Sequence, residues 1–477
     1  MPKKLREGFT TGSAATGAAL AALHLLRTGH APSVVAVPLP PFSFTPAPVP
    51  GQQPSSAEGA GACDRGIVPD GAGNRNGAGT MATHCEPAGA AIPALPVPRA
   101  FLRLEVTACG FGPAPELASH PEFAALFAQE TPAAHTARTA ASSACPNGHG
   151  SVNSGLRVAH ASIRKDGGDD PDATSGALIS VTVVENFPIA RHTAASNTTK
   201  AGTAPDLAHP FAVSIEGGPG VGRVTLPGLP VPVGEPAVNP TPRQQITLAL
   251  QSAAMQYGER PCQPLRVVIS VPEGERLARK TFNPRLGIVG GISILGTQGT
   301  VRPYSHQAWK ATIEQGLAVA VATGCRDMGL TTGRRSERLL MDKYPHMPQR
   351  SFIQAADFAE FSLKAAGAMP FENLIWACFF GKLVKLAQGH AYTHARHADL
   401  DMNELARLCR QCGAACADEV RHCVTAAHAL ELLLQDKAGN DVIALTGEKA
   451  AAVAAEFAGR PVRLHLFHTD GRELLAL

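Results

Sequence analysis

The sequence lacks the features that mark several large classes of protein. It carries 42 Lys plus Arg against 39 Asp plus Glu, and this near balance excludes a non-specific nucleic-acid binder, which needs many phosphate-neutralising groups on one face. No segment approaches the roughly 18 apolar residues of a membrane span, and the densest, LIWACFFGKLVKLA, contains two lysines. The N-terminal MPKKLREGFTTGS lacks the apolar core of a secretory signal. We therefore expect a soluble, cytoplasmic protein.

Cysteine number and glycine spacing exclude further classes. Eleven cysteines, an odd number in a chain without a secretory signal, argue against a disulfide framework. The glycine-rich segment EGGPGVGR, residues 216–223, lacks both the Gly-Lys-Ser/Thr ending of a P-loop and the Rossmann spacing. Its glycines still allow a backbone to approach a flat ligand closely.

Three irregular segments interrupt the chain. Residues 41–100 contain 31 Ala, Gly or Pro out of 60, so half of this segment offers almost no side chain to bury. The other two lie at about 110–158 and 189–210. We expect all three inserts to be surface loops or disorder without chemistry. The remaining residues, roughly 350, suffice for two domains.

Strand-like and helix-like segments alternate in the remainder. ALISVTVVE (177–185) and LRVVISV (265–271) predict buried strands, and TPRQQITLALQSAAMQYG (241–258) predicts a helix. After residue 300, the helical segments HQAWKATIEQ, DFAEFSLKAA and MNELARLCRQ alternate with the apolar NLIWACF and DVIALTG, which predicts an α/β layer with a parallel sheet. We place a domain boundary near 300, with an α+β domain over 1–300 and an α/β domain over 301–477.

The segment NPRLGIVGGISILGTQGTVRP, residues 283–303, combines two opposed tendencies. Its β-branched residues favour a buried strand, whereas its glycines permit positive φ angles and the close approach of another backbone or a flat ligand. One interpretation is a wall against which a ligand binds. The other is a tight turn between two buried strands. In either case the run offers no acid or base.

Seven segments of unusual composition together resemble one protein family. They are LREGFTTGSAATGAA (5–19), IRKDGGDDPDATSGALI (163–179), GGPGVGRVTLPGL (217–229), VGEPAVNPTPRQQI (233–246), NPRLGIVGGISILGT (283–297), TTGRRSE (331–337) and GKLVKLAQGHAYTHARH (381–397). Through them the chain resembles the cobalt-precorrin-5B C1-methyltransferase (CbiD) family of anaerobic cobalamin biosynthesis. The resemblance covers nearly the whole chain apart from the three inserts.

The resemblance implies both a fold and an activity. The fold is an N-terminal α+β domain followed by a Rossmann-like α/β domain with a parallel sheet. The activity is S-adenosylmethionine-dependent methylation of ring carbon C1 of cobalt-precorrin-5B, giving cobalt-precorrin-6A, with cobalt present only as part of the corrinoid substrate. We expect no nucleic-acid or membrane partner and no resident metal, and we expect a homo-oligomer or transient contacts with other enzymes of the pathway.

Two other functions are alternatives. One is a non-enzymatic corrinoid carrier of the same pathway, which would bind the carboxylate arms of the corrinoid in the same way but would bind no methyl donor. The other is an α/β oxidoreductase that uses the glycine loops for a dinucleotide, and the missing Rossmann spacing argues against it.

The glycine-rich and Thr-Thr-Gly segments are the expected ligand contacts. Helix N-termini attract anions and arginine pairs with carboxylates, which suits the acetate and propionate arms of a corrinoid. The expected donor contacts are Gly218, Gly220, Gly287, Gly290, Gly291 and Gly296. The expected substrate contacts are Thr10, Thr11, Gly12, Ser13, Thr331, Thr332, Gly333, Arg334 and Arg335. Ordinary helix capping is the alternative for both Thr-Thr-Gly turns.

The acidic loop KDGGDDPD, residues 165–172, supplies candidate proton-transfer groups. It would repel the carboxylates of the substrate, so we expect Asp166, Asp169 and Asp170 near the positive donor or acting as a general base. A metal site is a less favoured interpretation, because the spacing is not that of an EF-hand. An acidic surface turn is the alternative.

The histidines of GHAYTHARH supply a second candidate group. His390 is a candidate proton shuttle and His394 a candidate substrate contact. Together with His397, their spacing would place them on one helical face, but Gly389 should end the preceding helix. Structural or solvated histidines are the alternative.

Four cysteines lie close together near the C-terminus. Cys409, Cys412, Cys416 and Cys423 could ligate an iron–sulfur cluster, or they could pack on one face of a helix. The spacing is not that of radical S-adenosylmethionine enzymes, and the resembled family does not require these cysteines. We therefore expect core packing. Ala14 stands where family members often carry cysteine, which argues against a catalytic thiol at that position.

Overall fold

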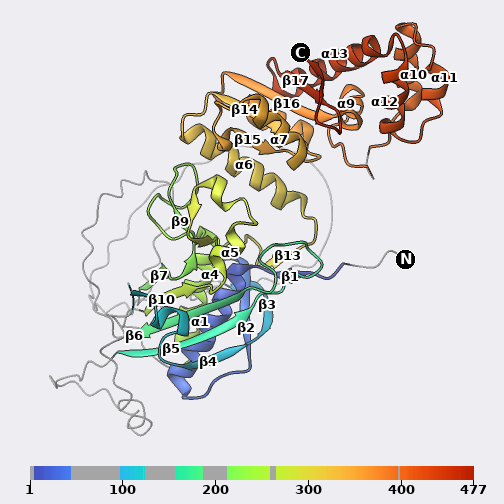
Figure 1. Cartoon of the computed structure of the whole chain (residues 1–477). Coiled ribbons are helices and arrows are strands. Elements are labelled where there is room, and N and C mark those ends of the chain that lie inside the picture. Colours follow the sequence, from blue (N-terminus) through green and yellow to red (C-terminus); the bar gives the residue numbers. More distant parts are fainter. Residues whose placement is uncertain are drawn as a thin grey trace, which may run out of the picture.

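The computed structural model describes seven parts of the chain, and all structural statements refer to them: 5–43, 97–121, 123, 156–185, 212–257, 265–395 and 398–477. It is a mixed α/β structure with two five-stranded sheets, one from each half of the chain (Figure 1). The helix α6 (His306–Ala322) lies between them and contacts the η2 turn (Asn283–Leu286) as well as the second sheet.

The first sheet has the strand order β4-β5-β6-β10-β7, and its neighbours pair antiparallel except β10 and β7. Its strands are β4 (Ala108–Phe111), β5 (Arg157–Arg164), β6 (Leu178–Glu185), β7 (Val213–Gly217) and β10 (Leu265–Ser270). The β-branched runs of β6 and β10 are buried along nearly their whole length, as expected for strands covered on both faces. The strands predicted over 177–185 and 265–271 are therefore confirmed.

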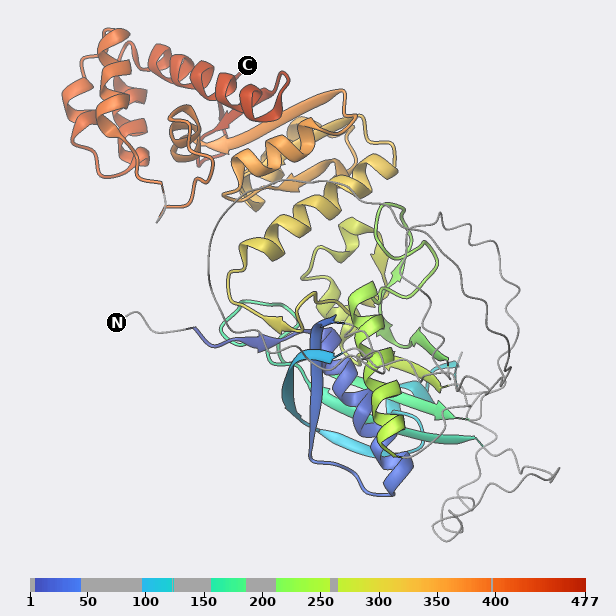
Figure 2. The ribbon, with the colours of Figure 1, turned by 180° about the vertical axis from the view of Figure 1, so that it is seen from behind.

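Two helices pack side by side against this sheet (Figure 2). They are α1 (Thr11–Thr28) and α4 (Pro240–Gln256), and α4 confirms the helix predicted over 241–258. The small alanines of α1 are fully buried, which lets its backbone approach β5 and β6 closely. The antiparallel pair β2 (Val34–Ser43) and β3 (Val97–Glu105) covers α1 from another side.

Short elements fill the space between this sheet and α6. They are β1 (Gly8–Phe9), β8 (Gly220–Val221), β9 (Arg223–Val224), α5 (Gly274–Ala278), β11 (Ile288–Val289), β12 (Gly291–Ile292) and β13 (Thr300–Val301). The short helix α2 (Pro115–Ala118) packs instead on the sheet, where Leu117 clusters with Val158, Val184 and Val268. The strand pairs are β1 with β13, β8 with β12 and β9 with β11. The run 283–303 is therefore neither one strand nor a turn between two buried strands. It is a 3-10 turn and three two-residue strands, divided at glycines with positive φ.

The second sheet has the order β15-β14-β16-β17-β18. Its first four strands are parallel, and β18 is antiparallel to β17. Its strands are β14 (Asp327–Thr331), β15 (Phe352–Gln354), β16 (Asn373–Phe379), β17 (Arg463–Phe467) and β18 (Glu473–Ala476). The connecting elements are α7 (Arg334–Lys343), η3 (Gln349–Ser351), α8 (Ala359–Gly367) and α9 (Phe380–Ala387). The chain passes from β14 to β15 on one side of β14 and then returns to β16 on its other side. The direction in which strands are added therefore reverses at β14.

Four helices that follow α9 and precede β17 complete the C-terminal part. They are α10 (Met402–Gln411), α11 (Ala417–Arg421), α12 (Ala426–Gln435) and α13 (Gly439–Ala458). The strand expected at DVIALTG is wrong, because this segment forms the first turns of α13. Its buried residues Val442, Ile443 and Thr446 recur at helical spacing, and a short apolar run alone does not distinguish the two structures.

The margins of the expected inserts are more regular than predicted. The pairing of β2 with β3 extends into 41–100 at both ends, and the end of β4, all of α2 and the start of β5 lie within 110–158. These margins are ordered because their strands are paired with neighbours. The remainder of the three inserts falls outside the described residues. No helix in the described ranges combines the length and apolarity needed to span a bilayer.

Candidate active site

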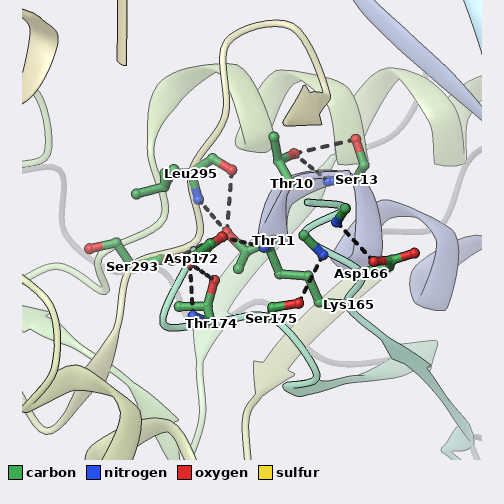
Figure 3. A network of polar contacts seen from close by, with 12 residues as sticks. Thr10, Thr11, Ser13, Lys165, Asp166, Asp172, Thr174, Ser175, Ser293 and Leu295 are labelled. Atoms are coloured by element: carbon green, nitrogen blue, oxygen red, sulfur yellow. Dashed lines mark hydrogen bonds and ion pairs between the residues drawn. The ribbon is translucent and has the colours of Figure 1, made fainter. Parts of the chain in front are cut away.

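A cavity of about 210 Å³ lies where five parts of the chain meet: the start of α1, the loop after β5, residues 224–239, residues 281–301 and α6. Most of its lining is apolar, and the apolar residues include Val224, Leu229, Leu286, Ile288 and Ile292. Six polar residues of the lining lie close together, Thr10, Thr11, Lys165, Asp172, Thr174 and Ser293 (Figure 3), and its other polar residues are Asn239, Thr281, Asn283, Thr312 and Gln315. The cavity thus brings together segments from five of the seven family-like motifs.

The start of α1 holds one wall of this cavity in place. Thr11 Oγ1 accepts a hydrogen bond from the Leu295 N–H at 2.9 Å, and Gly12 N–H donates to the Leu295 carbonyl at 3.2 Å. Ser13 Oγ donates to the Gly299 carbonyl at 2.8 Å. Thr10 caps the helix by accepting the Ser13 N–H at 3.1 Å. These donors are satisfied within the protein, so the turn caps α1 and fixes the 293–299 backbone. Of its four residues, Thr10 and Thr11 line the cavity.

The glycines expected to admit a ligand mainly admit other parts of the protein. A Cβ at Gly296 would lie 2.5 Å from Thr10 Cγ2, and one at Gly287 would lie 2.3 Å from Leu226 Cγ. Gly291 and Gly220 face each other so closely that a Cβ at Gly291 would lie 2.1 Å from the Gly220 carbonyl oxygen. Gly218 packs against Leu117, and Gly290 alone of the six has open space beside it. None of the six lines the cavity, and donor binding by them stays a prediction.

Lys165 and Asp172 form an ion pair among the six clustered polar residues of the cavity. Lys165 Nζ lies 2.5 Å from Asp172 Oδ2, and the lysine is only 2% exposed. Asp172 Oδ1 accepts hydrogen bonds from the Thr174 N–H at 2.7 Å and the Thr174 hydroxyl at 2.8 Å. Burial tends to raise the pKa of Asp172, but the lysine ammonium and the threonine donors outweigh it, so this pKa is lowered. Asp172 is therefore ionised at neutral pH.

The three aspartates predicted as catalytic lie elsewhere in the same loop and do not line the cavity. Asp166 pairs with the Arg6 guanidinium, whose hydrogen bond lowers the pKa of this carboxyl. Asp169 accepts the Arg6 N–H at 2.7 Å, and Asp170 accepts the Tyr304 N–H at 2.9 Å. Asp166 thus connects the loop to the Arg6 side chain, and Asp169 and Asp170 connect it to neighbouring backbone. The catalytic role of all three stays a prediction.

Sequence reasoning passed over Lys165, Asp172 and Thr174. The Asp-x-Thr pattern at 172–174 was the available signal, because Asp172 accepts hydrogen bonds from both the N–H and the hydroxyl of Thr174. From Gly168, two positions on, Asp166 accepts only an N–H. The pattern would have distinguished Asp172 from the other carboxylates of the loop.

The second Thr-Thr-Gly turn lies at the carboxyl edge of the second sheet, after β14. Thr331 is fully buried and donates to the Ile353 carbonyl at 3.3 Å, so it supports the sheet. Arg335 donates to the Thr469 carbonyl and lies over the Phe379 ring. Arg334 is exposed and makes no ion pair with a described residue. No side chain caps the start of α7, which leaves Thr332 and Gly333 beside its free N–H groups.

A buried ion pair joins this turn to the cavity wall. Arg285, in η2, pairs with both oxygens of Glu337, in α7, with Nη2 2.7 Å from Oε2. Gln354 Nε2 donates to the same oxygen at 2.7 Å. The Glu337 side chain is 3% exposed and that of Arg285 23%. The motifs NPRLG and TTGRRSE are thus linked directly, a contact that sequence reasoning did not anticipate.

The predicted histidines lie in the loop after α9. Gly389, at φ 77°, follows the end of this helix, as the sequence predicted. The histidines therefore do not share one helical face. His390 Nε2 lies 3.2 Å from the Asp399 carbonyl, and His394 stacks on Tyr392. Neither lines the cavity, and their roles stay predictions. His397 lies outside the described residues.

Two lysines of α9 fix this loop. Lys382 Nζ donates to the Thr393 carbonyl at 2.9 Å and pairs with Asp357, and Lys385 Nζ donates to the same carbonyl at 3.2 Å. Burial of Lys385, followed by the nearby Lys382 charge, lowers the pKa of the Lys385 amine. Both lysines therefore hold the loop against α9.

The four clustered cysteines pack in the core of the C-terminal part. Cys409, Cys416 and Cys423 are buried in it, and Cys412 packs against it, which confirms the predicted core packing. They do not lie on one helix, because α10 ends before Gly413, which has φ 73°. Burial raises the pKa of Cys409 to about 12 and that of Cys416 to about 11. In the described ranges no three His, Cys, Asp or Glu side chains form a metal-holding group.

Known proteins match this chain over most of its length. A family model described as CbiD matches residues 1–70 and 117–303, and one described as CbiD, C-terminal domain, matches 392–476. The cobalt-precorrin-5B C(1)-methyltransferase of Nitratidesulfovibrio vulgaris is 52% identical over 318 residues, which cover 65% of this chain and 76% of that protein. The protein of the same name from Geobacillus thermodenitrificans is 48% identical over 260 residues, 54% of this chain and 63% of that protein.

Among solved structures, the cobalamin biosynthesis protein (cbiD) from Archaeoglobus fulgidus is 21% identical, with a TM-score of 0.30 over 80% of this chain and 78% of that one. That TM-score is too low to support an argument about the site. The two family models and the relative at 52% identity decide the assignment: the chain belongs to the CbiD family.

Proposed function

We propose that this protein transfers a methyl group from S-adenosylmethionine to ring carbon C1 of cobalt-precorrin-5B, giving cobalt-precorrin-6A in anaerobic cobalamin biosynthesis. The observation that carries this proposal is the 52% identity, over 318 residues, to a cobalt-precorrin-5B C(1)-methyltransferase. The family model described as CbiD matches residues 1–70 and 117–303, which include the motifs that surround the cavity.

The cavity is suited to one end of a methyl donor. Its walls are largely apolar, and its charged groups lie together. S-adenosylmethionine would supply a methyl group on a sulfonium, whose positive charge is lost on transfer, so the protein need not stabilise new charge. What the chain contributes is positioning and exclusion of water. The hydrogen bonds between Thr11 and Leu295 supply rigidity to one wall.

Asp172 is poorly suited to accept a proton. Its lowered pKa makes the carboxylate a weak base, because the charged form is already stabilised by Lys165 and Thr174. Asp172 is better suited to orient the lysine. Asp166, Asp169, Asp170 and His390 stay proposals for proton transfer, and each lies outside the cavity lining.

The carboxyl edge of the second sheet is our proposed contact for the carboxylate arms of the corrinoid. In open α/β sheets, ligands bind where the chain reverses its direction across the sheet, which here is the end of β14. The exposed Arg334 and the uncapped start of α7 support this assignment. The proposed contacts are Thr331, Thr332, Gly333, Arg334, Arg335 and His394.

We propose further that the chain has two domains with a boundary near residue 300, the second Rossmann-like. The four parallel strands with intervening helices support this assignment. The pairing of β13 with β1 supports placing residues up to 301 with the first domain. A cytoplasmic location and an oligomeric state stay predictions from the sequence.

A methyl-transfer assay tests the function. Purified protein is incubated with cobalt-precorrin-5B and S-adenosylmethionine carrying a labelled methyl group, and the corrinoid is analysed by mass spectrometry and NMR. We expect one labelled methyl group at C1. Corrinoid binding without methyl transfer, together with no binding of S-adenosylhomocysteine in calorimetry, would instead establish the carrier function.

A further inference from the structure

The ammonium group of Lys165 has unused hydrogen-bonding capacity inside the cavity. It carries three N–H donors, and Asp172 Oδ2 is its one hydrogen-bond acceptor in the described part of the chain. The residue is 2% exposed, so bulk water does not satisfy the other two donors. Leaving such donors unsatisfied in a buried position is costly, which indicates that a further acceptor belongs there.

Asp172, the ion-pair partner of Lys165, has no comparable unused hydrogen-bonding capacity. Asp172 already accepts two hydrogen bonds at Oδ1, both from Thr174, and one from the lysine at Oδ2. A cationic ligand would therefore meet a carboxylate that is already neutralised. An anionic ligand would meet a cation with two free donors. Lys165 and Asp172 are the charged residues among those described in the lining, so the lysine decides the preference.

We propose that the cavity binds a carboxylate on a short apolar stem, with the carboxylate oxygens accepting hydrogen bonds from Lys165 Nζ. A volume of about 210 Å³ is below the roughly 300–1,000 Å³ of pockets that enclose a whole small molecule, so the cavity takes one end of a larger ligand. The apolar walls at Val224, Leu286 and Ile292 accommodate the stem.

This inference rests on the proposed function, which offers two ligands with the required group. One is the methyl donor, whose methionine part ends in an α-carboxylate. The other is the corrinoid, whose acetate and propionate arms are carboxylates on short stems. The shared chemistry is the same in both, and binding measurements distinguish them.

The experiment compares the wild-type protein with three variants. Lys165→Met keeps the apolar stem and removes the charge. The double variant Lys165→Met/Asp172→Asn removes both charges, so that no unpaired carboxylate stays buried, and it serves if the single variant does not fold. Lys364→Met, at an exposed position on α8, is the matched control. Thermal unfolding establishes that each variant is folded.

Three quantities are then measured on the folded proteins. Two are calorimetric affinities, for S-adenosylhomocysteine and for 5′-methylthioadenosine, which lacks the amino-acid part. The third is the KM for cobalt-precorrin-5B. Losing a charged hydrogen bond should weaken the relevant binding about 10- to 100-fold. A loss for S-adenosylhomocysteine but not for 5′-methylthioadenosine assigns the site to the donor carboxylate. A raised KM for the corrinoid with unchanged S-adenosylhomocysteine affinity assigns it to a substrate arm.

Unchanged donor affinity and unchanged corrinoid KM in a folded Lys165 variant overturn the inference while the proposed function stands. A wild-type protein that neither binds S-adenosylhomocysteine nor methylates the corrinoid refutes the proposed function and this inference together. The two failures are distinguished by the wild-type measurement alone.

Discussion

The ion pair between Arg285 and Glu337 gives an asymmetric prediction. Substituting Arg285→Met leaves the Glu337 carboxylate buried, with the Gln354 amide as its one remaining side-chain hydrogen-bond donor among the described residues. Substituting Glu337→Gln leaves the guanidinium instead, and its side chain is 23% exposed against 3% for the glutamate. The arginine can therefore recruit water when its partner is lost, whereas the glutamate cannot.

The magnitudes follow from this difference in burial. Removing one partner of a buried ion pair costs about 3–5 kcal/mol, and Arg285→Met should fall near the lower end because the pair is not wholly enclosed. Glu337→Gln keeps an acceptor oxygen for one hydrogen bond, so we expect about 1–2 kcal/mol. The double variant should cost less than the sum of the two by about 1–3 kcal/mol, because the two residues act on one interaction.

Urea unfolding followed by tryptophan fluorescence measures these values. The two tryptophans of the chain, Trp309 and Trp376, lie on α6 and β16. The matched control is the ion pair Arg326–Glu372, whose arginine also contacts both carboxylate oxygens but whose side chains are 75% and 53% exposed. Arg326→Met should cost less than about 1 kcal/mol. The reasoning is refuted if Arg285→Met costs no more than that control, or if Glu337→Gln costs as much as Arg285→Met.

Three further predictions concern the glycines, the cysteines and the acidic loop. Gly296→Ala should lower Tm more than Gly290→Ala, because both have positive φ but only the first would drive a Cβ into the cap of α1, at 2.5 Å; equal shifts in thermal unfolding would contradict this. Cys409 and Cys416, with pKa values raised to about 12 and 11, should resist alkylation by iodoacetamide at pH 8 until the protein unfolds. Rapid labelling of either cysteine in the native protein, detected by peptide mapping, would count against their burial. The folded-state pKa of Asp172 is lowered, so its contribution to stability should be complete above its ordinary pKa of 3.8 and disappear as pH falls through the lowered value. A Tm difference between the wild-type protein and Asp172→Asn that stays constant from pH 6 to pH 2 would exclude this linkage.

Local patterns predicted the regular elements well where one periodicity dominated. The β-branched runs at β6 and β10 and the helix α4 lie where the sequence indicated. The strand predicted at DVIALTG was wrong because a short, mostly apolar run fits a buried strand as well as a buried helical turn. The environment of α13, rather than the segment itself, decides between them.

The candidate site was predictable in its motifs but not in its contacts. The glycines of 283–303 correctly indicated close approach, yet the sequence could not say that the approaching group at Gly296 is Thr10. The contacts of Thr11 with Leu295 and of Arg285 with Glu337 join residues 284 and 52 positions apart. Such pairings depend on how the sheets pack, and no local pattern encodes them.

The bond between Thr11 and Leu295 also bears on the time order of folding during synthesis. Because these residues are 284 positions apart, α1 leaves the ribosome long before the backbone that completes its N-terminal contacts exists. At about 5–20 residues per second the delay is roughly 15–60 s. Within that interval the alanine-rich face of α1 can already pack on β5 and β6, but the N-terminal cap of α1 lacks its partner, so this end of the helix reaches its final packing late.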